Sequence, residues 1–248
     1  MKKQEGPKLH DRQRLIFEIL RGRRFEKMLE IGCATGYLSG VLKRFAGKMT
    51  SIDINPEYVR QAKMNVKGVR FFLCPAEKLI FKESGFDAVI FLDVLEHTLD
   101  PAKAVSQIHS KMRKGGTLYL SVPHKGWFAF LDADNVRRWL ILGFPGFYRW
   151  LYRTLTGKNL AKIDASPLHR HYSVREIKGF LGEDFNLEDV YLRGCLLYPL
   201  GLLADPFVKR MPLVGAGVQR ILEWLLDLDF RIGFGPASYN LLVVARKR

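Results

Sequence analysis

Short apolar runs alternate with helical patterns between residues 25 and 122, and no other feature of this 248-residue chain constrains its fold as strongly. The apolar runs predict strands at residues 27–31, 49–54, 69–73, 86–92 and 117–122, with helices beginning at Tyr37, Glu57 and Pro101. Gly115 and Gly116 are expected to form the turn before the last of these strands. Because elements that alternate in this way connect by right-handed crossovers, we predict an α/β fold with a doubly wound, mostly parallel sheet.

The regions on either side of this alternation have a different pattern. Interspersed apolar and charged residues predict a lead-in helix within residues 1–24, at 9–20. Beyond residue 122 we expect an aromatic and basic stretch at 127–153, a helix from Ser173, and strands at 187–192 and 239–245. The segment 194–235 is much too long for a hairpin turn between those two strands. We therefore predict a single domain, 1–248, whose second half (124–248) carries insertions at about 126–165 and 195–235.

The chain is strongly basic, with 40 Lys and Arg residues against 25 Asp and Glu residues and a formal net charge of +15. Such a charge favours an anionic partner by long-range attraction, and RNA, an acidic membrane surface and a phosphorylated small molecule all qualify. A basic, solvated surface with no specific partner explains the same charge.

Cysteine spacing and hydropathy constrain the compartment. Cys33, Cys74 and Cys195 are far apart, which favours neither a zinc site nor a disulfide framework. No apolar run reaches the ~18 residues that span a bilayer. The first residues lack the apolar segment of a secretory signal. We therefore expect a cytoplasmic protein.

The first predicted strand ends in a turn that lets a ligand approach the backbone closely. Glu30 lies near the end of the strand, and Gly32 and Gly36 stand in the turn that follows. The turn is not the dinucleotide fingerprint G-x-G-x-x-G, because Ala34 stands between the two glycines. At the end of the second strand, Asp53 offers a carboxylate that can accept hydrogen bonds from both hydroxyls of a ribose.

Five segments then follow one another in a familiar order within residues 25–123: LEIGCATGYLS, SIDINPEY, CPAEKLIF, FDAVIFLDVLEHTLDP and KGGTLYLSVP. Through them the sequence resembles the class I S-adenosylmethionine-dependent methyltransferases, in particular the type 11 and ubiquinone-biosynthesis-like members. The resemblance implies a Rossmann-like sheet of seven strands with an antiparallel last strand and helical insertions. It also implies S-adenosylmethionine as cofactor, S-adenosylhomocysteine as product, and residues 25–123 as the cofactor-binding half.

The same resemblance implies cofactor contacts for nine residues: Glu30, Gly32, Cys33, Gly36, Asp53, Ile54, Ala76, Glu77 and Asp93. The glycine turn would face the methionine part, and Asp53 would hold the ribose. The residues after the second and third strands would border the adenine, and Asp93 would lie beside the sulfonium. A nicotinamide cofactor is the alternative for the turn, and a solvated loop carboxylate is the alternative for Glu77.

Methylation of a hydroxyl requires a proton acceptor, and three histidines are the catalytic candidates: His97, His124 and His171. His97 and His124 follow the fourth and fifth strands, at the edge of the sheet where ligands bind, although His97 also suits a structural role in its loop. His171 lies in the segment His169-Arg170-His171-Tyr172, which resembles the HxHY segment of methyltransferases related to quinone, lipid or sugar methylation. In those relatives the segment lies near the substrate.

Substrate contacts are accordingly predicted for four residues: Trp127, His169, Arg170 and Tyr172. A packed loop with no substrate contact is the alternative for residues 169–172. Some quinone O-methyltransferases carry an ExxEH metal motif where this chain has Asp93-Val94-Leu95-Glu96-His97. Asp93 departs from that motif, and the same residues occur in metal-independent relatives, so no metal is predicted.

The acceptor is the least constrained part of the prediction. Aromatic residues interleaved with arginines at 127–153, together with apolar stretches at 195–207 and 218–228, favour O-methylation of a hydrophobic small molecule that is lipid-like, a quinone or a sugar-lipid. The enzyme would contact the anionic inner face of a membrane peripherally. A soluble small-molecule methyltransferase, a packed core under these stretches and a non-enzymatic cofactor-binding protein are the alternatives. An RNA methyltransferase is less favoured, because LDVLEH lacks the Asn/Asp-Pro-Pro-aromatic signature of base-amino methylation. No oligomeric state is predicted.

Overall fold

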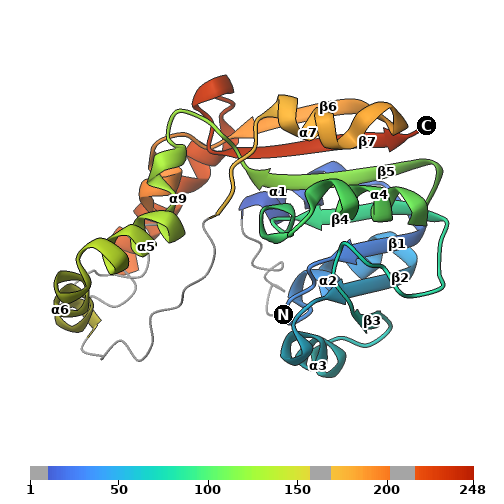
Figure 1. The fold of residues 1–248 in the computed structure, drawn as a ribbon, viewed down its shortest axis with the longest axis horizontal. Helices are drawn as coiled ribbons and strands as arrows, with labels where there is room; N and C mark the ends of the chain where they lie inside the picture. Colours follow the sequence, from blue (N-terminus) through green and yellow to red (C-terminus); the bar gives the residue numbers. More distant parts are fainter. Residues whose placement is uncertain (1–10, 157–168, 202–215) are drawn as a thin grey trace. The chain divides into compact units, whose positions relative to one another are not determined.

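The computed structural model describes residues 11–156, 169–201 and 216–248 (Figure 1). Contacts within the chain group it into two compact units. The sheet unit comprises Met1–Val122, Val174–Val190 and Leu242–Arg248, and the helical unit comprises Pro123–Ser173 and Tyr191–Leu241. The prediction of a single domain with two insertions stays a prediction, and parts of both predicted insertions, 157–165 and 202–215, lie outside the described residues.

Seven strands form one sheet in the order β3-β2-β1-β4-β5-β7-β6. Their bounds are β1 Phe25–Ile31, β2 Ala46–Asp53, β3 Arg70–Leu73, β4 Phe86–Leu92, β5 Met112–Pro123, β6 Phe185–Arg193 and β7 Asn240–Lys247. The strands from β3 to β5 pair in parallel. Figure 1 shows that β7 runs opposite to its neighbours β5 and β6. The predicted doubly wound, mostly parallel, seven-stranded sheet with an antiparallel last strand is confirmed.

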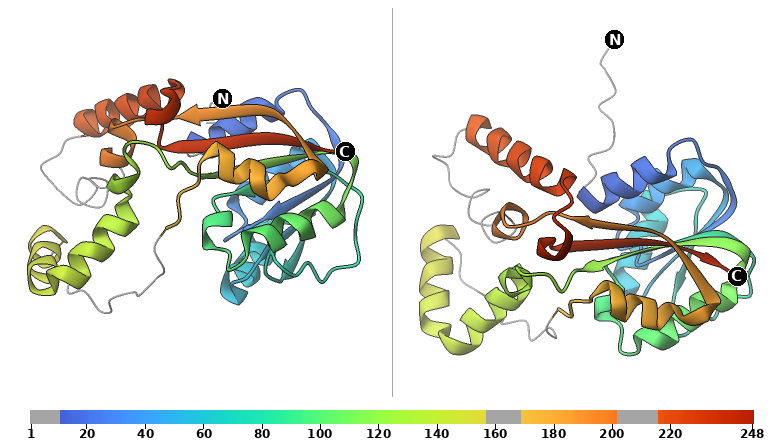
Figure 2. Two further views of the ribbon diagram at one scale, coloured as in Figure 1. Left: turned by 45° about the horizontal axis from the view of Figure 1, so that its top comes forward. Right: turned by 90° about the horizontal axis from the view of Figure 1, so that it is seen from above.

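The described helices are α1 Asp11–Leu20, α2 Tyr37–Leu42, α3 Pro56–Asn65, α4 Pro101–Lys111, α5 Ala133–Gly143, α6 Pro145–Thr156, α7 Val174–Leu181 and α9 Ala216–Arg231. Short 3-10 helices are η1 Lys43–Phe45, η2 Leu95–His97, η3 Ala129–Leu131, η4 Gly182–Asp184 and η5 Gly235–Ala237. In the sheet unit, α4 and α7 cover one face of the sheet and α1 and α2 cover the other (Figure 2).

Local sequence explains where the helices of the sheet unit begin. The side chain of Asn55 accepts hydrogen bonds from the N–H groups of Glu57 and Tyr58, and Pro56 occupies the first turn of α3. Asp100 and Pro101 begin α4 in the same way, since the Asp100 carboxylate accepts from the Lys103 N–H at 3.0 Å. Both helices therefore start directly after a loop at the carboxyl edge of the sheet, which positions the loops that precede them.

The inner strands supply the core of the sheet unit. Both faces of β1 and β4 are covered, and Leu29, Val89 and Ile90 are fully buried. Such strands read as continuous apolar runs rather than alternating ones, which is why the sequence predicted them well.

Predicted boundaries differ from the structure at Gly115 and Gly116 and at Ile54. The predicted turn at Gly115 and Gly116 is wrong, because both residues lie inside β5, where the register against β4 shifts between Phe86 and Ala88. Gly115 has φ +74° there, so the glycines accommodate an irregularity within the strand instead of ending it. Ile54 was predicted within the second strand, but β2 ends at Asp53. The predicted lead-in helix begins at Asp11 as described, and residues 9 and 10 lie outside the described residues.

The helical unit contains α5, α6 and α9, which the aromatic and amphipathic patterns at 127–153 and 218–228 had suggested. Asp132 caps α5, because its carboxylate accepts the Asn135 N–H at 2.9 Å. Among the residues that the structure describes, no helix has the length and apolar character needed to cross a membrane.

Candidate functional site

The turn between β1 and α2 is built on left-handed backbone conformations. Gly32, Ala34 and Gly36 have φ values of +82°, +44° and +85°. A side chain at Gly32 would place its Cβ 2.2 Å from Cγ2 of Val94, in the loop after β4. A Cβ at Gly36 would lie 3.1 Å from the Cα of Ala62 in α3. The glycines therefore let the turn pack closely against two neighbouring segments, and larger residues would push it out of place.

Asp53 ties the end of β2 to this turn. Its Oδ2 accepts the Ala34 N–H at 2.8 Å, and its Oδ1 accepts the Asn55 N–H at 2.9 Å. Each carboxylate oxygen keeps a further lone pair, so the group is held in one orientation and can still accept hydrogen bonds from a ligand. Beside it, the apolar side chain of Ile54 is 72% exposed. An oriented carboxylate next to an exposed apolar surface is the arrangement that a ribose and an adjoining adenine require.

Glu30 is buried beneath the turn and is 1% exposed. Its Oε2 accepts hydrogen bonds from the hydroxyls of Ser39 and Ser51, the latter at 2.8 Å. Its Oε1 is buried with no hydrogen-bond partner among the described residues. Burial raises the pKa of Glu30 to about 7, the Ser39 and Ser51 hydroxyls oppose the rise, and the nearby Asp53 carboxylate adds to it.

Cys33 contributes backbone rather than a reactive thiol. Its side chain lies in a buried cluster with residues of α3 and β3, and burial raises the pKa of the thiol, with Glu30 and Asp53 adding to that effect. Its N–H donates to the Ile52 carbonyl at 2.9 Å. The side chain therefore packs beneath the turn, which leaves the backbone at this position as the part that a ligand could contact.

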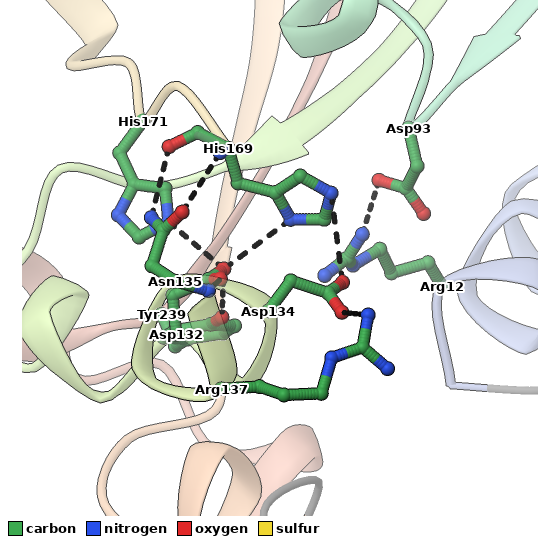
Figure 3. A network of polar contacts seen from close by, with 9 residues as sticks. All are labelled: Arg12, Asp93, Asp132, Asp134, Asn135, Arg137, His169, His171 and Tyr239. Carbon is green, nitrogen blue, oxygen red and sulfur yellow. Dashed lines mark hydrogen bonds and ion pairs between the residues drawn. The ribbon is translucent and has the colours of Figure 1, made fainter. Parts of the chain in front are cut away.

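Asp93 follows β4 in a strained conformation, with φ +54°. Its N–H donates to the Ser121 carbonyl at 3.0 Å, and its Oδ1 accepts from the Ser121 hydroxyl at 2.9 Å. The same oxygen forms an ion pair with Arg12 of α1, shown in Figure 3. Asp93 is thus fixed by β5 and by α1, and left-handed strain at a non-glycine residue is typical of functional loops.

Two of the residues predicted near the adenine, Ala76 and Glu77, lie in the loop after β3. Ala76 is buried, and Glu77 accepts the Leu99 N–H at 2.8 Å through its Oε1. The Glu77 carboxylate therefore stabilises the loop that precedes α4.

These residues fit S-adenosylmethionine. The oriented Asp53 carboxylate suits the ribose hydroxyls, the exposed Ile54 suits the adenine, and the side-chain-free turn at Gly32 and Gly36 admits the methionine part close to the backbone. Bound S-adenosylmethionine supplies a methyl group on a positively charged sulfur, which an attacking nucleophile displaces in line.

The helical unit contains a second polar cluster, centred on Asp132, which is 2% exposed (Figure 3). Its Oδ2 accepts from the Tyr239 hydroxyl at 2.7 Å and from Nε2 of His171 at 3.1 Å, and lies 3.5 Å from Nδ1 of His169. Burial works to raise the pKa of Asp132, but contacts from His169, His171, the Asn135 N–H and Tyr239 outweigh it and hold that pKa well below its usual range. Asp132 is therefore a buried anion.

Asn135 fixes the backbone of the predicted histidine segment. Its side-chain Oδ1 accepts the His169 N–H at 2.9 Å, and its Nδ2 donates to the His169 carbonyl at 3.1 Å. Together with Asp132, it holds two histidines of the HRHY segment against the start of α5.

His124 lies in a separate hydrogen-bonded arrangement of the helical unit. It is buried, its Nδ1 lies 2.8 Å from the Ser238 carbonyl, and residue 124 forms a parallel bridge with Tyr172. Because a carbonyl only accepts, Nδ1 carries the proton and Nε2 is the basic nitrogen in the neutral ring. A Cβ at Gly126 would lie 2.2 Å from the Ser238 carbonyl oxygen, so this close packing requires glycine.

The structure brings together only some of the predicted acceptor-side residues. His169 and His171 share Asp132, and the ring of His171 lies edge-on to Tyr239 with centroids 5.9 Å apart. Arg170 and Trp127 are exposed, and Tyr172 is buried. His97, in the sheet unit, is exposed at the end of η2. Within the described residues, no group of three or more His, Cys, Asp and Glu side chains is arranged to hold a metal.

Sequence reasoning missed four residues of these clusters: Arg12, Asp132, Asn135 and Tyr239. The available signal for Asp132 was its place before the helical pattern ADNVRRWL, which predicts an N-cap. Nothing local marked it as a partner of histidines that lie 37 and 39 residues further along the chain.

Known proteins match both the sequence and the fold. Residues 29–120 match the family described as "Methyltransferase domain". A ubiquinone biosynthesis O-methyltransferase of Xanthomonas campestris pv. campestris (strain B100) is 33% identical over 126 residues, which are 47% of this chain and 53% of that protein. The chain thus matches about half the length of this curated relative.

Solved structures resemble the fold at low sequence identity. A TehB-like SAM-dependent methyltransferase from Corynebacterium glutamicum has a TM-score of 0.57 at 14% identity, over 98% of this chain and 90% of its own. The N-methyltransferase NodS from Bradyrhizobium japonicum WM9, solved in complex with S-adenosyl-l-homocysteine, has a TM-score of 0.53 at 15% identity, over 96% and 86% of the two chains. Residues 29–120 thus match a methyltransferase domain, and the solved structures show that the chain shares the fold of S-adenosylmethionine-dependent methyltransferases.

Proposed function

We propose that the protein transfers a methyl group from S-adenosylmethionine to an oxygen of a hydrophobic, lipid-like small molecule such as a quinone or a sugar-lipid. The observation that carries the choice of acceptor is the large set of exposed aromatic and aliphatic side chains in the helical unit. The Xanthomonas relative, a ubiquinone biosynthesis O-methyltransferase, supports the same substrate class.

The exposed set occupies two stretches. On α5, α6 and the residues between them it comprises Trp139, Leu142, Phe144, Phe147 and Trp150, all more than half exposed. On α9 it comprises Ile221, Trp224 and Leu228, whose spacing places them along one side of the helix, and Ile232 follows the end of α9. Large apolar residues gathered at this density are uncommon on a protein that contacts only water.

Charge complements the first of these stretches. Arg137, Arg149 and Arg153 are exposed on α5 and α6, and the whole chain carries +15. Aromatic rings at the depth of lipid headgroups and arginines at the charged surface are typical of interfacial helices, and each basic residue near anionic lipid contributes about 1 kcal/mol. We therefore propose peripheral contact with an anionic membrane, from which a hydrophobic acceptor would be taken.

In this proposal the residues of the sheet unit bind the cofactor through the turn at Gly32 and Gly36 and through Asp53. One of the candidate histidines, His97, His124 or His171, removes the proton from the acceptor hydroxyl. RNA is the second candidate, because the +15 charge and exposed tryptophans also suit stacked bases and phosphates. A soluble small-molecule acceptor differs from the first proposal only in lacking the membrane contact.

The test is transfer of label from methyl-labelled S-adenosylmethionine into an extract of the source cells, separated into lipid, nucleic-acid and water-soluble fractions. Asp53→Ala, which should not bind the cofactor, is the control. We expect label in the lipid fraction with the wild-type protein alone. Label in RNA or in the water-soluble fraction would contradict the lipid-like acceptor, and no label above the control would contradict the enzymatic function.

Membrane contact has its own test. The wild-type protein should float with vesicles that contain anionic phospholipid and should stay unbound with neutral vesicles. A Trp139→Ser, Trp150→Ser double variant should float less, whereas Met64→Ser, which removes an exposed apolar residue of α3, should float normally. Equal flotation of all three proteins would contradict the assignment of α5 and α6 as the contact surface.

A further inference from the structure

Basic residues gather at the edge of the sheet that lies opposite to the turn after β1. The parallel strands β1, β2, β4 and β5 all begin at this edge, and β7, which runs the other way, ends there beside the start of β5 (Figure 1). The turn between α1 and β1 lies at the same edge, because it leads directly into β1. We call the following exposed residues of these segments the basic edge: Arg21, Arg23, Arg24, Lys48, Lys114 and Arg248. All of them belong to the sheet unit.

The cations of the basic edge are not neutralised by carboxylates. None of them forms an ion pair with a carboxylate among the residues that the structure describes. Arg23 donates to the hydroxyl of the buried Tyr119 at 3.3 Å, and Arg248 donates to the side-chain oxygen of Asn186 at 2.6 Å. Because both acceptors are uncharged, they orient the two guanidinium groups and leave their charge available to a partner.

Other arginines occupy part of the acidic side chains at this edge. The ion pairs join Glu83, Asp87 and Glu188 to Arg70, Arg113 and Arg246, respectively. Glu26, Glu183 and Asp184 remain exposed, and they are fewer than the cations of the basic edge. The surface at this edge therefore stays positive.

Neighbouring like charges make the basic edge unfavourable in the absence of a partner. Lys48 lies beside Lys27 in the register of β1 and β2. Like charges at neighbouring positions of adjacent strands repel each other and destabilise a sheet. An anionic partner would replace this repulsion by attraction.

The basic edge contains no apolar contact surface. Within the described residues, none of the exposed large apolar side chains lies at 21–27, 46–48, 112–116 or 246–248. A protein partner buries aromatic side chains at the centre of its interface, and an interfacial membrane segment inserts apolar side chains among the lipids. A nucleic-acid backbone requires neither, because arginines and lysines bind its phosphates directly.

The dimensions of the sheet fit a nucleic-acid strand. From β2 through β1, β4 and β5 to β7, adjacent strands lie about 4.8 Å apart, so this part of the edge is about 19 Å long. Phosphates that follow one another at about 3.4 Å along a strand would place about five of them along it.

The position of the basic edge argues against a membrane as its partner. The turn after β1 lies at the other end of a strand of seven residues, about 23 Å away. A membrane against the basic edge would leave that turn, where we propose that the cofactor binds, on the far side of the sheet unit. A lipid-like acceptor could then not reach the cofactor from that membrane.

We propose that the basic edge binds the phosphate backbone of a nucleic acid, independently of base sequence, at a site separate from the site of methyl transfer. The bound strand is not the methyl acceptor, because it lies at the edge opposite to the turn after β1. The inference therefore does not depend on the acceptor proposed above.

The first measurement is the fluorescence anisotropy of a short labelled RNA of mixed sequence, titrated with the wild-type protein at several salt concentrations. Contact with about five phosphates of a single strand predicts that log K falls with log salt concentration with a slope of about −3.5. A second RNA of equal length and different sequence should bind with the same affinity. A slope near zero, or binding of only one of the two sequences, would overturn the proposal without any variant.

Two double variants with the same change in net charge locate the contact. Arg24→Glu, Lys48→Glu reverses two charges of the basic edge, and Lys78→Glu, Lys103→Glu reverses two exposed charges outside it. The first should weaken RNA binding by about tenfold or more, and the second should weaken it much less. The milder Arg24→Ala, Lys48→Ala should reduce the salt slope to about −2. Equal losses in the two glutamate variants would show that only net charge matters and would overturn the proposal.

Flotation with vesicles of anionic phospholipid separates a nucleic acid from a lipid surface. Arg24→Glu, Lys48→Glu should float as the wild-type protein does and should bind S-adenosylmethionine normally, which also shows that it is folded. Lost flotation with unchanged RNA binding would assign the basic edge to lipid and overturn the proposal. Asp53→Ala should bind RNA as the wild type does, so a failure of methyl transfer and a failure of RNA binding are observed separately.

Discussion

The sheet unit and the helical unit each bury a carboxylate, and the two carboxylates are in opposite states. Glu30 in β1 receives two hydroxyl hydrogen bonds on one oxygen, none on the other, and has its pKa raised to about 7. Asp132, before α5, receives a backbone N–H, a tyrosine hydroxyl and two histidines, and its pKa lies well below the usual range. Both are almost fully buried. The difference shows that the donors around a carboxylate, rather than its burial alone, decide whether it stays charged.

The contrast also separates two kinds of chemistry. A carboxyl group that is neutral through much of the accessible pH range can tolerate the absence of a partner on one oxygen. A buried anion requires partners on both, and it can balance positive charge that forms nearby during a reaction. We therefore associate Glu30 with the architecture of the turn after β1 and Asp132 with holding its histidine and tyrosine partners in place.

Removing the Asp132 carboxylate should give the largest change in the free energy of unfolding. Asp132→Ala deletes the cap of α5 and leaves the donors of His171 and Tyr239 without their acceptor. We expect the free energy of unfolding at pH 7 to fall by about 3–5 kcal/mol, as it does when one partner of a buried charged group is removed. Urea denaturation measures it. A loss below 1 kcal/mol would show that Asp132 is not the buried anion described above.

The pH dependence of the same variant sharpens that result. The folded-state pKa of Asp132 is depressed, so its contribution is fully present above its ordinary pKa of 3.8 and is lost as pH falls below that value. The stability difference between wild type and Asp132→Ala should therefore narrow in acid, provided that the protein remains folded there.

Glu30 should give a pH dependence of the opposite sign. Its pKa rises from 4.5 to about 7 on folding, so the folded state binds more protons and stability falls as pH increases through this interval. At about 1.4 kcal/mol per pKa unit, the loss between pH 4.5 and pH 8 should approach about 3 kcal/mol. Glu30→Gln should flatten this part of the curve, and an unchanged slope would contradict the assignment.

A smaller change tests the donors themselves. Ser51→Ala removes one of the two hydroxyls on Glu30 and should cost about 1 kcal/mol at neutral pH, where part of the carboxyl population is ionised. The titration of Glu30 should move to higher pH. Ser110→Ala, which removes an exposed serine hydroxyl that donates to the Gln107 carbonyl of the same helix, is the control.

The two clusters also differ in how far they could be predicted from the sequence. Gly32, Gly36 and Asp53 end consecutive parallel strands or begin the turn after one, so spacing alone brings them to one edge of the sheet. The Asp132 cluster joins residues 132–135, 169–171 and 239, and the Tyr239 contact spans 107 residues. No local periodicity encodes such a contact, although the histidines themselves were recognisable as a short segment of titratable residues.

The sequence predicted the start of the fifth strand and the end of the second strand wrongly. Gly115 and Gly116 carry the composition of a turn, but they accommodate a register shift inside β5. Ile54 has the apolar character of a strand residue, yet it lies beyond β2 and is largely exposed. In both cases residue type was informative, and the neighbouring strand decided the conformation.

We propose that the turn after β1 and the carboxylate ending β2 bind S-adenosylmethionine, and that the Asp132 cluster takes no part in this binding. The most direct test is the dissociation constant of S-adenosylmethionine, measured by calorimetry for the wild-type, Asp53→Ala and His171→Ala proteins. Losing charged hydrogen bonds at Asp53 should weaken binding by about 100-fold or more, whereas His171→Ala should bind as the wild type does. Wild-type affinity in Asp53→Ala, or lost affinity in His171→Ala, would contradict the account.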